Sequence, residues 1–418
     1  MKKNIIKLIE LFLILSPLFD MLTACMIQAL NINFTIGMVV RFIIILICVF
    51  YLIFIYKDKD KKYLLLILGS IFIYLLIFLV LTIVNKDISV LLYEGQNALK
   101  TFYLPILLLS FYAIIKENKS FITNKTIVTV YIIYLLGIFI PDILGIGFDS
   151  YAVSKEGSIG FFNTANEISA IISILMPFFL LYLYNKKNFF LTILLVGVLV
   201  FDILSMGTKG PLLSFVLILG VFLFIYIIYL AKERLYKILS ILVVTLILFI
   251  LFISFYLPRT AFYKNIEIHL DFLGVDNVME VFTDYELFDH FIFSSRLKFL
   301  GNTFNSYKDS STLEKIFGIG YIENYGTDDA STKMIEMDYF DILFRHGVVG
   351  FIIYMGVFIF FLYKTFKFTY SIKDNSYKIC NYLSLTLIIL LSLITGHVLL
   401  APSVSIFVAL ILTKRDVI

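Results

Sequence analysis

The sequence predicts an all-α polytopic membrane protein with about twelve transmembrane helices and one large loop outside the membrane. Hydrophobic residues make up 61% of the 418 residues, and charged residues make up only 15%. Apolar runs long enough to cross a bilayer recur along the chain. These runs are continuous rather than alternating, which favours helices over the strands of a β-barrel. A single long polar interval, between residues 257 and 350, interrupts them.

Twelve apolar segments are long enough for a helix across about 30 Å of hydrocarbon. We expect nine of them in residues 1–257, a large extracytoplasmic loop over 258–338 and three more in residues 339–418. The segments cover residues 5–27, 36–56, 63–84, 99–115, 124–145, 163–184, 189–206, 211–230, 238–257, 340–363, 379–397 and 399–413.

The distribution of basic residues predicts the orientation. Most Lys and Arg outside the polar interval lie near the two ends of the chain and in the connections after even-numbered segments, such as 57–62 and 364–378. Because cytoplasmic loops are enriched in these residues, both termini are predicted to lie in the cytoplasm and the 258–338 loop outside.

Several kinds of chemistry lack their characteristic sequence motif in this chain. The sequence has no P-loop, Rossmann glycine pattern, GxSxG or HExxH motif. Its three cysteines are isolated and lack the spacing of a metal site. The basic residues form short clusters beside apolar runs rather than a phosphate-binding face. We therefore expect no metal, no cofactor and no nucleic-acid partner.

The end of the polar interval carries the densest group of candidate residues. In EMDYFDILFRHG, Asp338, Asp341 and Arg345 recur at helical spacing, so they share one stripe, and Asp341 and Arg345 form a favourable i, i+4 pair. Acids in a first helical turn can simply stabilise the helix dipole. Alternatively, Glu336 or Asp338 acts as a base at the membrane surface. His346 is expected to be a buried helix residue with a satisfied ring.

Two other connections on the same side hold polar candidates. Asn163 and Asn166 precede an apolar segment, where they either cap the helix or contact a substrate. Lys209 follows a tight SMGT turn, where it is either an interfacial lysine with its head in water or a cation for a substrate.

Four local patterns occur in a recognisable order. They are FFNTANEISAIISILMP, LSMGTKGPLLSFV, SSRLKFL followed by IFGIGY, and EMDYFDILFRHGVVGFIIY. Together with the predicted topology they resemble the O-antigen ligase / Wzy-type polysaccharide polymerase family of bacterial envelopes. The matching positions are Lys209, Arg296, Gly318, Gly320, Gly347 and Gly350.

The resemblance implies a GT-C-like fold and glycosyl transfer from an undecaprenyl-diphosphate-linked glycan at the bacterial cytoplasmic membrane. It implies that Arg296 and Lys209 bind the diphosphate, and that Glu336, assisted or oriented by Asp338, activates the attacking hydroxyl. Ligases of the family usually carry histidine at the position of Glu336. The Glu-x-Asp version resembles capsule and exopolysaccharide polymerases, so a polymerase is favoured over a ligase.

Three alternatives remain at this stage. They are a ligase that moves finished glycan to another acceptor, a flippase or other transporter, and a non-catalytic membrane scaffold. A transporter usually places ionisable residues near the middle of the membrane, whereas those of this chain fall near predicted segment ends. The expected partners are the lipid-linked glycan and the bilayer, with a flippase and a chain-length regulator of the same pathway as further candidates.

Overall fold

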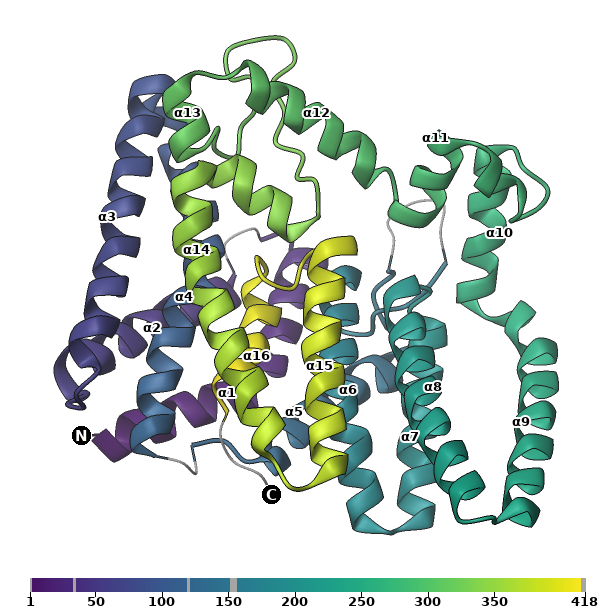
Figure 1. Cartoon of the computed structure of the whole chain (residues 1–418). Coiled ribbons are helices and arrows are strands. Elements are labelled where there is room, and N and C mark those ends of the chain that lie inside the picture. The colour runs from purple at the N-terminus through teal and green to yellow at the C-terminus, as the bar shows by residue number, and fades with distance from the viewer. Residues whose placement is uncertain (1, 33–34, 119–120, 151–155, 415–418) are drawn as a thin grey trace.

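The computed structural model describes residues 2–32, 35–118, 121–150 and 156–414. Within these residues the chain forms helices and turns, with two isolated β-bridges and no strand. Each of the twelve predicted apolar segments is helical, as Figure 1 shows. The corresponding helices are α1 (Lys2–Gln28), α2 (Ile36–Phe50), α3 (Lys61–Asn85), α4 (Leu91–Glu117), α5 (Asn124–Ile143), α6 (Ala165–Lys186), α7 (Phe189–Ser205), α8 (Lys209–Lys232), α9 (Tyr236–Tyr256), α14 (Asp338–Ser371), α15 (Asn375–Ile394) and α16 (Pro402–Thr413).

Length and hydropathy support a membrane location for this bundle. In the part of the chain that the structure describes, eight helices are long and apolar enough to cross a membrane. They are α2, α3, α4, α5, α6, α8, α14 and α15, and two further apolar helices, α7 and α16, are shorter. The predicted all-α polytopic membrane fold is therefore confirmed.

The centre of the bundle is formed by α4, α6 and α16. The most apolar stretches of α4 and α6 are 83% and 78% buried, whereas that of α8 is 17% buried. Helix α16 packs against both α4 and α6, and α15 and α5 pack on α6. Helices of low burial present Leu, Ile and Phe outward, which suits contact with lipid. The short segment before α16 is thereby joined to a helix at the buried centre of the bundle.

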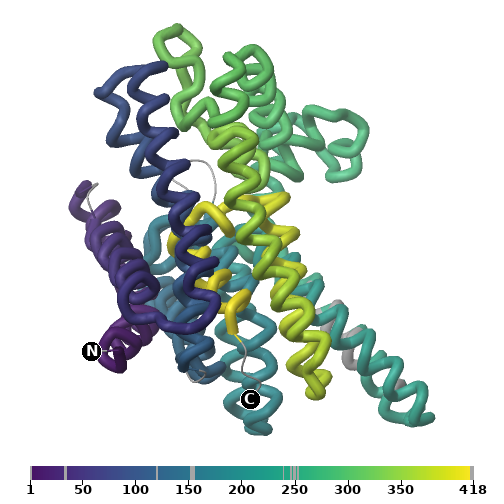
Figure 2. Tube along the Cα trace, turned by 60° about the vertical axis from the view of Figure 1, so that its left-hand side comes forward, coloured from purple at the N-terminus to yellow at the C-terminus, as the bar shows by residue number. Residues whose placement is uncertain are grey.

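The polar interval folds into short helices at one end of the bundle. These are α10 (Ala261–Leu273), α11 (Tyr285–Phe288), α12 (Arg296–Asp309) and α13 (Thr312–Phe317). Figures 1 and 2 show them together at the end of the molecule opposite to both chain termini. Helices α12 and α13 contact α14, so the polar interval is fastened to the helix that follows it.

Helix α14 is kinked at Gly347, whose φ of 62° and ψ of −174° are not helical. A Cβ atom at this position would lie 2.5 Å from the backbone nitrogen of Gly318, so the turn after α13 packs directly on the kink. Glycine is needed here both for the positive φ and for the close approach. The kink separates a first short helical stretch, from Asp338 to His346, from the long stretch that follows.

We predict that Gly347→Ala lowers the stability of the folded protein, because alanine disfavours the positive φ and its methyl group collides with backbone. Gly356→Ala is the matched control, since nothing lies within 4 Å of a Cβ atom at Gly356 in the same helix. The first change is expected to cost more than about 1 kcal/mol and the second to be neutral or slightly stabilising. Thermal unfolding of the detergent-solubilised chain measures both. Equal melting temperatures for the two variants would contradict this account of the kink.

Candidate active site

Three segments that are far apart in the sequence meet at the end of the bundle that carries the polar helices. Arg296 begins α12, Glu336 lies in the turn before α14, and His397 lies between α15 and α16. The Arg296 Nη2 atom donates to Glu336 Oε2 at 2.9 Å, and Lys333 Nζ lies 3.0 Å from Glu336 Oε1. His397 Nε2 lies 3.6 Å from Glu336 Oε2, which is an ion-pair separation rather than a hydrogen bond. Glu336 is therefore the common partner of three basic side chains.

Left-handed backbone is concentrated at this meeting point. Glu336 and His397 have φ values of 63° and 58°, and the two residues before Arg296, Ser294 and Ser295, have φ values of 54° and 65°. Residues other than glycine rarely adopt this backbone conformation, which costs on the order of 1–2 kcal/mol per residue. The four account for half of the eight such residues in the described ranges. Strain is therefore retained where the charged groups are positioned.

Two buried carboxylates hold the turns that carry Glu336 and His397. The Asp341 side chain accepts from the backbone N–H groups of residues 335–337 at 3.1, 2.9 and 3.3 Å. The Asp338 side chain accepts from the N–H groups of residues 397–399 at 2.9, 3.0 and 2.7 Å. Each aspartate is 1% exposed, so water does not compete for these hydrogen bonds. Asp338 therefore orients the connection before α16, and its oxygens are occupied by backbone.

A third buried carboxylate holds the start of α12. Asp289, which is 4% exposed, accepts from the backbone N–H groups of Leu297 and Lys298, both at 2.9 Å. These donors belong to the first turn of the helix, where N–H groups lack helical partners. A small apolar cluster that includes Leu297 and Phe344 packs α12 on α14. Asp289 and this cluster together determine where the Arg296 side chain emerges.

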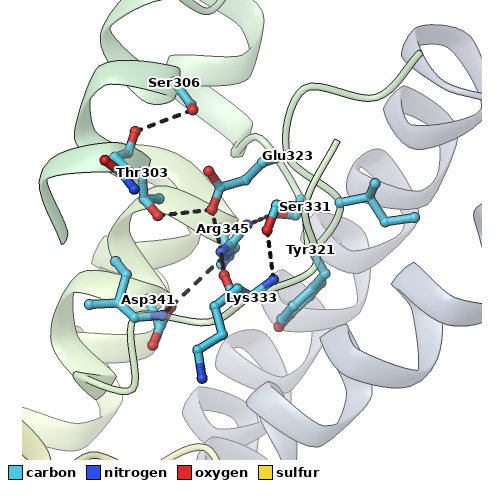
Figure 3. Close-up of polar contacts among 12 residues, drawn as sticks. Thr303, Ser306, Tyr321, Glu323, Ser331, Lys333, Asp341 and Arg345 are labelled. Carbon is cyan, nitrogen blue, oxygen red and sulfur yellow. Dashed lines mark hydrogen bonds and ion pairs between the residues drawn. The ribbon is translucent and has the colours of Figure 1, made fainter. Parts of the chain in front are cut away.

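Arg345 joins the polar interval to α14. It does not line the cavity that Arg296 and Lys209 share. Its Nη2 atom donates to Glu323 Oε1 at 2.5 Å and to the Lys333 carbonyl oxygen at 2.8 Å, and its Nη1 atom donates to the Gly320 carbonyl oxygen at 3.2 Å (Figure 3). The predicted pair with Asp341 is present at 3.9 Å. Because the side chain is 1% exposed and its two terminal nitrogens have partners within the protein, we assign Arg345 to structure rather than to substrate binding.

The Gly-x-Gly turn is held by a carboxylate from another helix. Glu94 of α4, which is completely buried, accepts from the backbone N–H groups of Tyr321 and Ile322 at 2.7 and 3.0 Å. Glu94 also pairs with Lys86. The turn therefore has a structural role and is tied to the buried helix α4.

The three histidines of the polar interval and of α14 make internal contacts. His346 is fully buried, and its ring nitrogens lie 3.0 and 2.7 Å from the hydroxyl oxygens of Tyr74 and Tyr321, as expected for a satisfied helix histidine. The His269 Nε2 atom lies 2.8 Å from the His290 Nδ1 atom. In the described part of the chain, no group of three metal-binding side chains comes together.

A cavity of about 100 Å³ lies beside Arg296. Lys209, at the start of α8, lines the same cavity, so the two predicted cations share one space although they are far apart in the sequence. The Lys209 ammonium group contacts the Phe291 carbonyl oxygen and lies 4.0 Å from the centre of the Phe291 ring. The lining further includes Asn166, Ser169, Thr208, Asn265, His269, Ser294 and Thr395.

The two candidate asparagines have different surroundings, and neither caps a helix. The N-cap of α6 is Thr164, which makes no side-chain capping bond. Asn163 instead accepts from the Gln28 amide at 3.0 Å, which joins it to α1. Asn166 is exposed and lines the cavity. The capping interpretation is therefore wrong for both residues, and Asn166 is the asparagine that accompanies Lys209 and Arg296.

The charges of Glu336 and His397 reinforce one another. Burial opposes ionisation of Glu336, but the charges of His397, Arg296 and Lys333 outweigh it and hold its pKa well below the usual value. Burial also opposes protonation of His397, but Glu336 outweighs it, with Glu167 and Asp338 adding to the effect, and its pKa is raised. Near neutral pH the carboxylate is ionised and the imidazole has an elevated affinity for a proton.

His397 was not among the predicted site residues, because it falls inside the predicted apolar segment 379–397. In the structure α15 ends at Ile394, and His397 lies in the non-helical connection before α16. A local signal for this end exists. Gly396 has a φ of 62°, as glycines after helices often do, and Pro402 is the first residue of the next helix. The proximity of His397 to Glu336 has no such signal.

The fold and this site define a membrane-embedded protein with a cation-lined cavity beside an ionised carboxylate. The family model of O-antigen ligase like membrane proteins matches residues 2–280 and 281–415. The chain belongs to this family, and membrane glycan processing is the function the family supports. No curated protein matches the sequence significantly.

We predict that Asp338→Asn loosens the connection before α16, because a carboxamide cannot accept all three backbone N–H groups that the carboxylate accepts. Leaving buried donors unpaired costs about 1–3 kcal/mol. The matched control is Asp329→Asn, since Asp329 is exposed. Hydrogen exchange of residues 397–399, followed by mass spectrometry, is expected to quicken only in Asp338→Asn. Unchanged protection in that variant would remove Asp338 from its positioning role.

Proposed function

We propose that this protein is a polysaccharide polymerase that joins undecaprenyl-diphosphate-linked repeat units on the outer face of the bacterial cytoplasmic membrane. One observation carries the proposal: Arg296 lines the cavity that contains Lys209 and also donates a hydrogen bond to Glu336. A cation site for a diphosphate and a carboxylate for a hydroxyl are therefore adjacent. The orientation rests on the predicted cytoplasmic location of the basic loops.

The cations suit the departure of a lipid diphosphate. As the bond between the sugar's anomeric carbon and the phosphate oxygen breaks, its electron pair stays on that oxygen, and negative charge grows on the diphosphate. Fixed cations stabilise this charge more in the transition state than in the bound donor. Arg296 offers a planar fork of N–H donors, and Lys209 offers a compact charge on the same cavity.

The carboxylate suits the attacking group. The acceptor is a sugar hydroxyl of another repeat unit, and its proton must leave as the new carbon–oxygen bond forms. Glu336 is ionised and lies next to Arg296, so a hydroxyl between it and the cavity would face both groups. The diphosphate linkage already supplies the activation, so the reaction needs no nucleotide sugar. Asp338 supports the site by orienting backbone rather than by touching the reacting atoms.

The alternative function is that of a ligase, which transfers finished glycan to a different acceptor. The resemblance covers both ligases and polymerases. The Glu-x-Asp pattern at Glu336 and Asp338 is similar to that of the polymerases. Products distinguish the two. Loss of a polymerase leaves single repeat units on the carrier lipid, whereas loss of a ligase leaves long chains on it. A flippase would leave units on the cytoplasmic face of the membrane.

We predict that Arg296→Ala and Glu336→Ala each abolish glycan lengthening in cells that lack the chromosomal gene. The removal of one such group costs about 10²-fold or more in rate. Single lipid-linked units should accumulate while immunoblots show normal protein levels. Lys298→Ala, which removes an exposed cation from the same helix, and Glu286→Ala, which removes an exposed acid from the loop, serve as controls and should keep wild-type chain lengths.

Wild-type chain lengths in both site variants would reject the assignment. Accumulation of long chains on the carrier lipid, instead of single units, would identify a ligase.

We predict that Lys209→Met weakens donor use more than Lys209→Arg, because only the arginine retains a cation on the cavity. In proteoliposomes supplied with lipid-linked repeat units, the donor concentration for half-maximal rate should rise about tenfold in the methionine variant, which corresponds to about 1.4 kcal/mol. The arginine variant should stay close to wild type. If both variants behave like the wild type, Lys209 does not bind the donor.

A further inference from the structure

Glu336 alone is a weak proton acceptor. It is the shared partner of Arg296, Lys333 and His397, and these basic groups, His397 when it is protonated, hold the pKa of the Glu336 carboxyl well below its usual value. A carboxylate stabilised in this way keeps a proton poorly, whereas efficient general bases have a pKa near the working pH. The proposed reaction nevertheless requires the acceptor's proton to leave. A neighbouring group with greater proton affinity is better suited to take that proton.

His397 is positioned to be that group. Its Nε2 atom is buried, has no hydrogen-bond partner in the described structure and lies 3.6 Å from Glu336 Oε2. About a third of the side chain is exposed (32%), so the ring is not enclosed in the protein core. A movement of less than an ångström would bring the two atoms to hydrogen-bond distance. Catalytic hydrogen bonds are often long before the substrate binds.

The surrounding structure keeps the two side chains facing one another. Asp341 and Asp338 hold the backbone of residues 335–337 and 397–399, on which Glu336 and His397 adopt left-handed conformations. The two turns also touch directly, since a Cβ atom on Gly396 would collide with the Glu336 carbonyl group. Such strain persists only where the surroundings enforce it, and it gathers at functional sites.

We propose that Glu336 and His397 act as a single proton-accepting pair, in which the imidazole receives the acceptor's proton and the carboxylate orients the ring and stabilises its charge. This inference rests on the proposed glycosyl transfer and names the group that completes it. The assignment makes His397 a functional residue and Asp338 the residue that positions it.

The step balances without any further reagent. The hydroxyl O–H bond breaks, and its electron pair forms the new bond from oxygen to the anomeric carbon. The bond from that carbon to the diphosphate oxygen breaks, and the lipid diphosphate leaves with its electron pair. The proton moves to the Nδ1 atom of the neutral imidazole, whose Nε2–H faces Glu336, and then passes to water. The same division of work between histidine and carboxylate operates in hydrolytic triads.

The sign of the pH dependence follows from the groups that face the pair. Glu336, Glu167 of α6 and Asp338 of α14 face His397 and raise its pKa above the ordinary value, against the effect of burial. Arg296 and Lys333 face Glu336. Only neutral imidazole can accept a proton, so the rate should rise with pH through the elevated pKa of His397. If Glu336 acted alone, its low pKa would leave the rate flat over the same interval.

The test uses purified full-length protein in proteoliposomes, with lipid-linked repeat units extracted from cells that lack the gene. His397→Asn is the main variant, because asparagine tolerates positive φ and should preserve the turn. We predict a loss of about 10²-fold in the rate at saturating donor, with an unchanged melting temperature. His397→Gly, which also suits the backbone, should lose activity similarly and recover part of it when free imidazole is added.

The pH profile supplies a second readout that a structural role would not move. Between about pH 5.5 and pH 8.5, where histidines titrate, the wild-type rate should rise with pH. His397→Asn should lose this rise. Glu336→Gln removes the main cause that raises the histidine pKa, so its residual rate should rise at lower pH than the wild type.

The outcomes separate the inference from the proposed function. If the wild type does not lengthen the repeat units, the proposed function fails. If the wild type lengthens them and His397→Asn keeps its rate and pH rise, only the pairing of Glu336 with His397 is wrong. Loss of activity without rescue by imidazole, and with the pH rise retained, would likewise overturn it and leave His397 a structural residue.

Discussion

Buried aspartates that accept backbone N–H groups underlie the whole site. Asp289, Asp338 and Asp341 each hold the turn of a different segment, and these turns present Arg296, His397 and Glu336. A carboxylate out of water is stabilised only when donors surround it, and unpaired backbone N–H groups carry a comparable cost. Each aspartate therefore satisfies donors that its turn would otherwise leave unpaired. The resulting network fixes left-handed backbone that the chain would not adopt by itself.

Arg296 and Glu336 carry opposite charges and lie in contact at the edge of the cavity. Arg296 contributes to the cavity and also pairs with Glu336, so in the proposed reaction one side chain would couple donor binding to the charge on the carboxylate. A diphosphate that draws Arg296 toward the cavity would weaken its hold on Glu336. Lys333 and His397 would then be the remaining partners of that carboxylate. In the proposed reaction, binding of the lipid-linked donor and activation of the acceptor would therefore be physically linked.

The helices were predictable because a membrane leaves a segment few alternatives. Every backbone N–H and C=O group must be paired within hydrocarbon, so an apolar run of sufficient length becomes a helix whatever its neighbours. The predicted segment 379–397 nevertheless extended past the true end of α15 at Ile394, because hydropathy does not register the turn around Gly396. The candidate residues Arg296 and Glu336 were also predictable, through the resemblance to a family. Their direct contact was not.

Local composition was therefore sufficient to predict the helices and to list the charged candidates, and it is the basis of the predicted orientation in the membrane. Only the packing of α12, α14 and the α15–α16 connection decided which candidates meet, and that packing joins residues as distant as Asp338 and 397–399. It also decided their roles: Arg345 and Asp338 became structural, Asn166 joined the cavity and His397 entered the site. Hydropathy depends on each segment and the solvent around it, whereas the environment of a side chain depends on which other segments surround it.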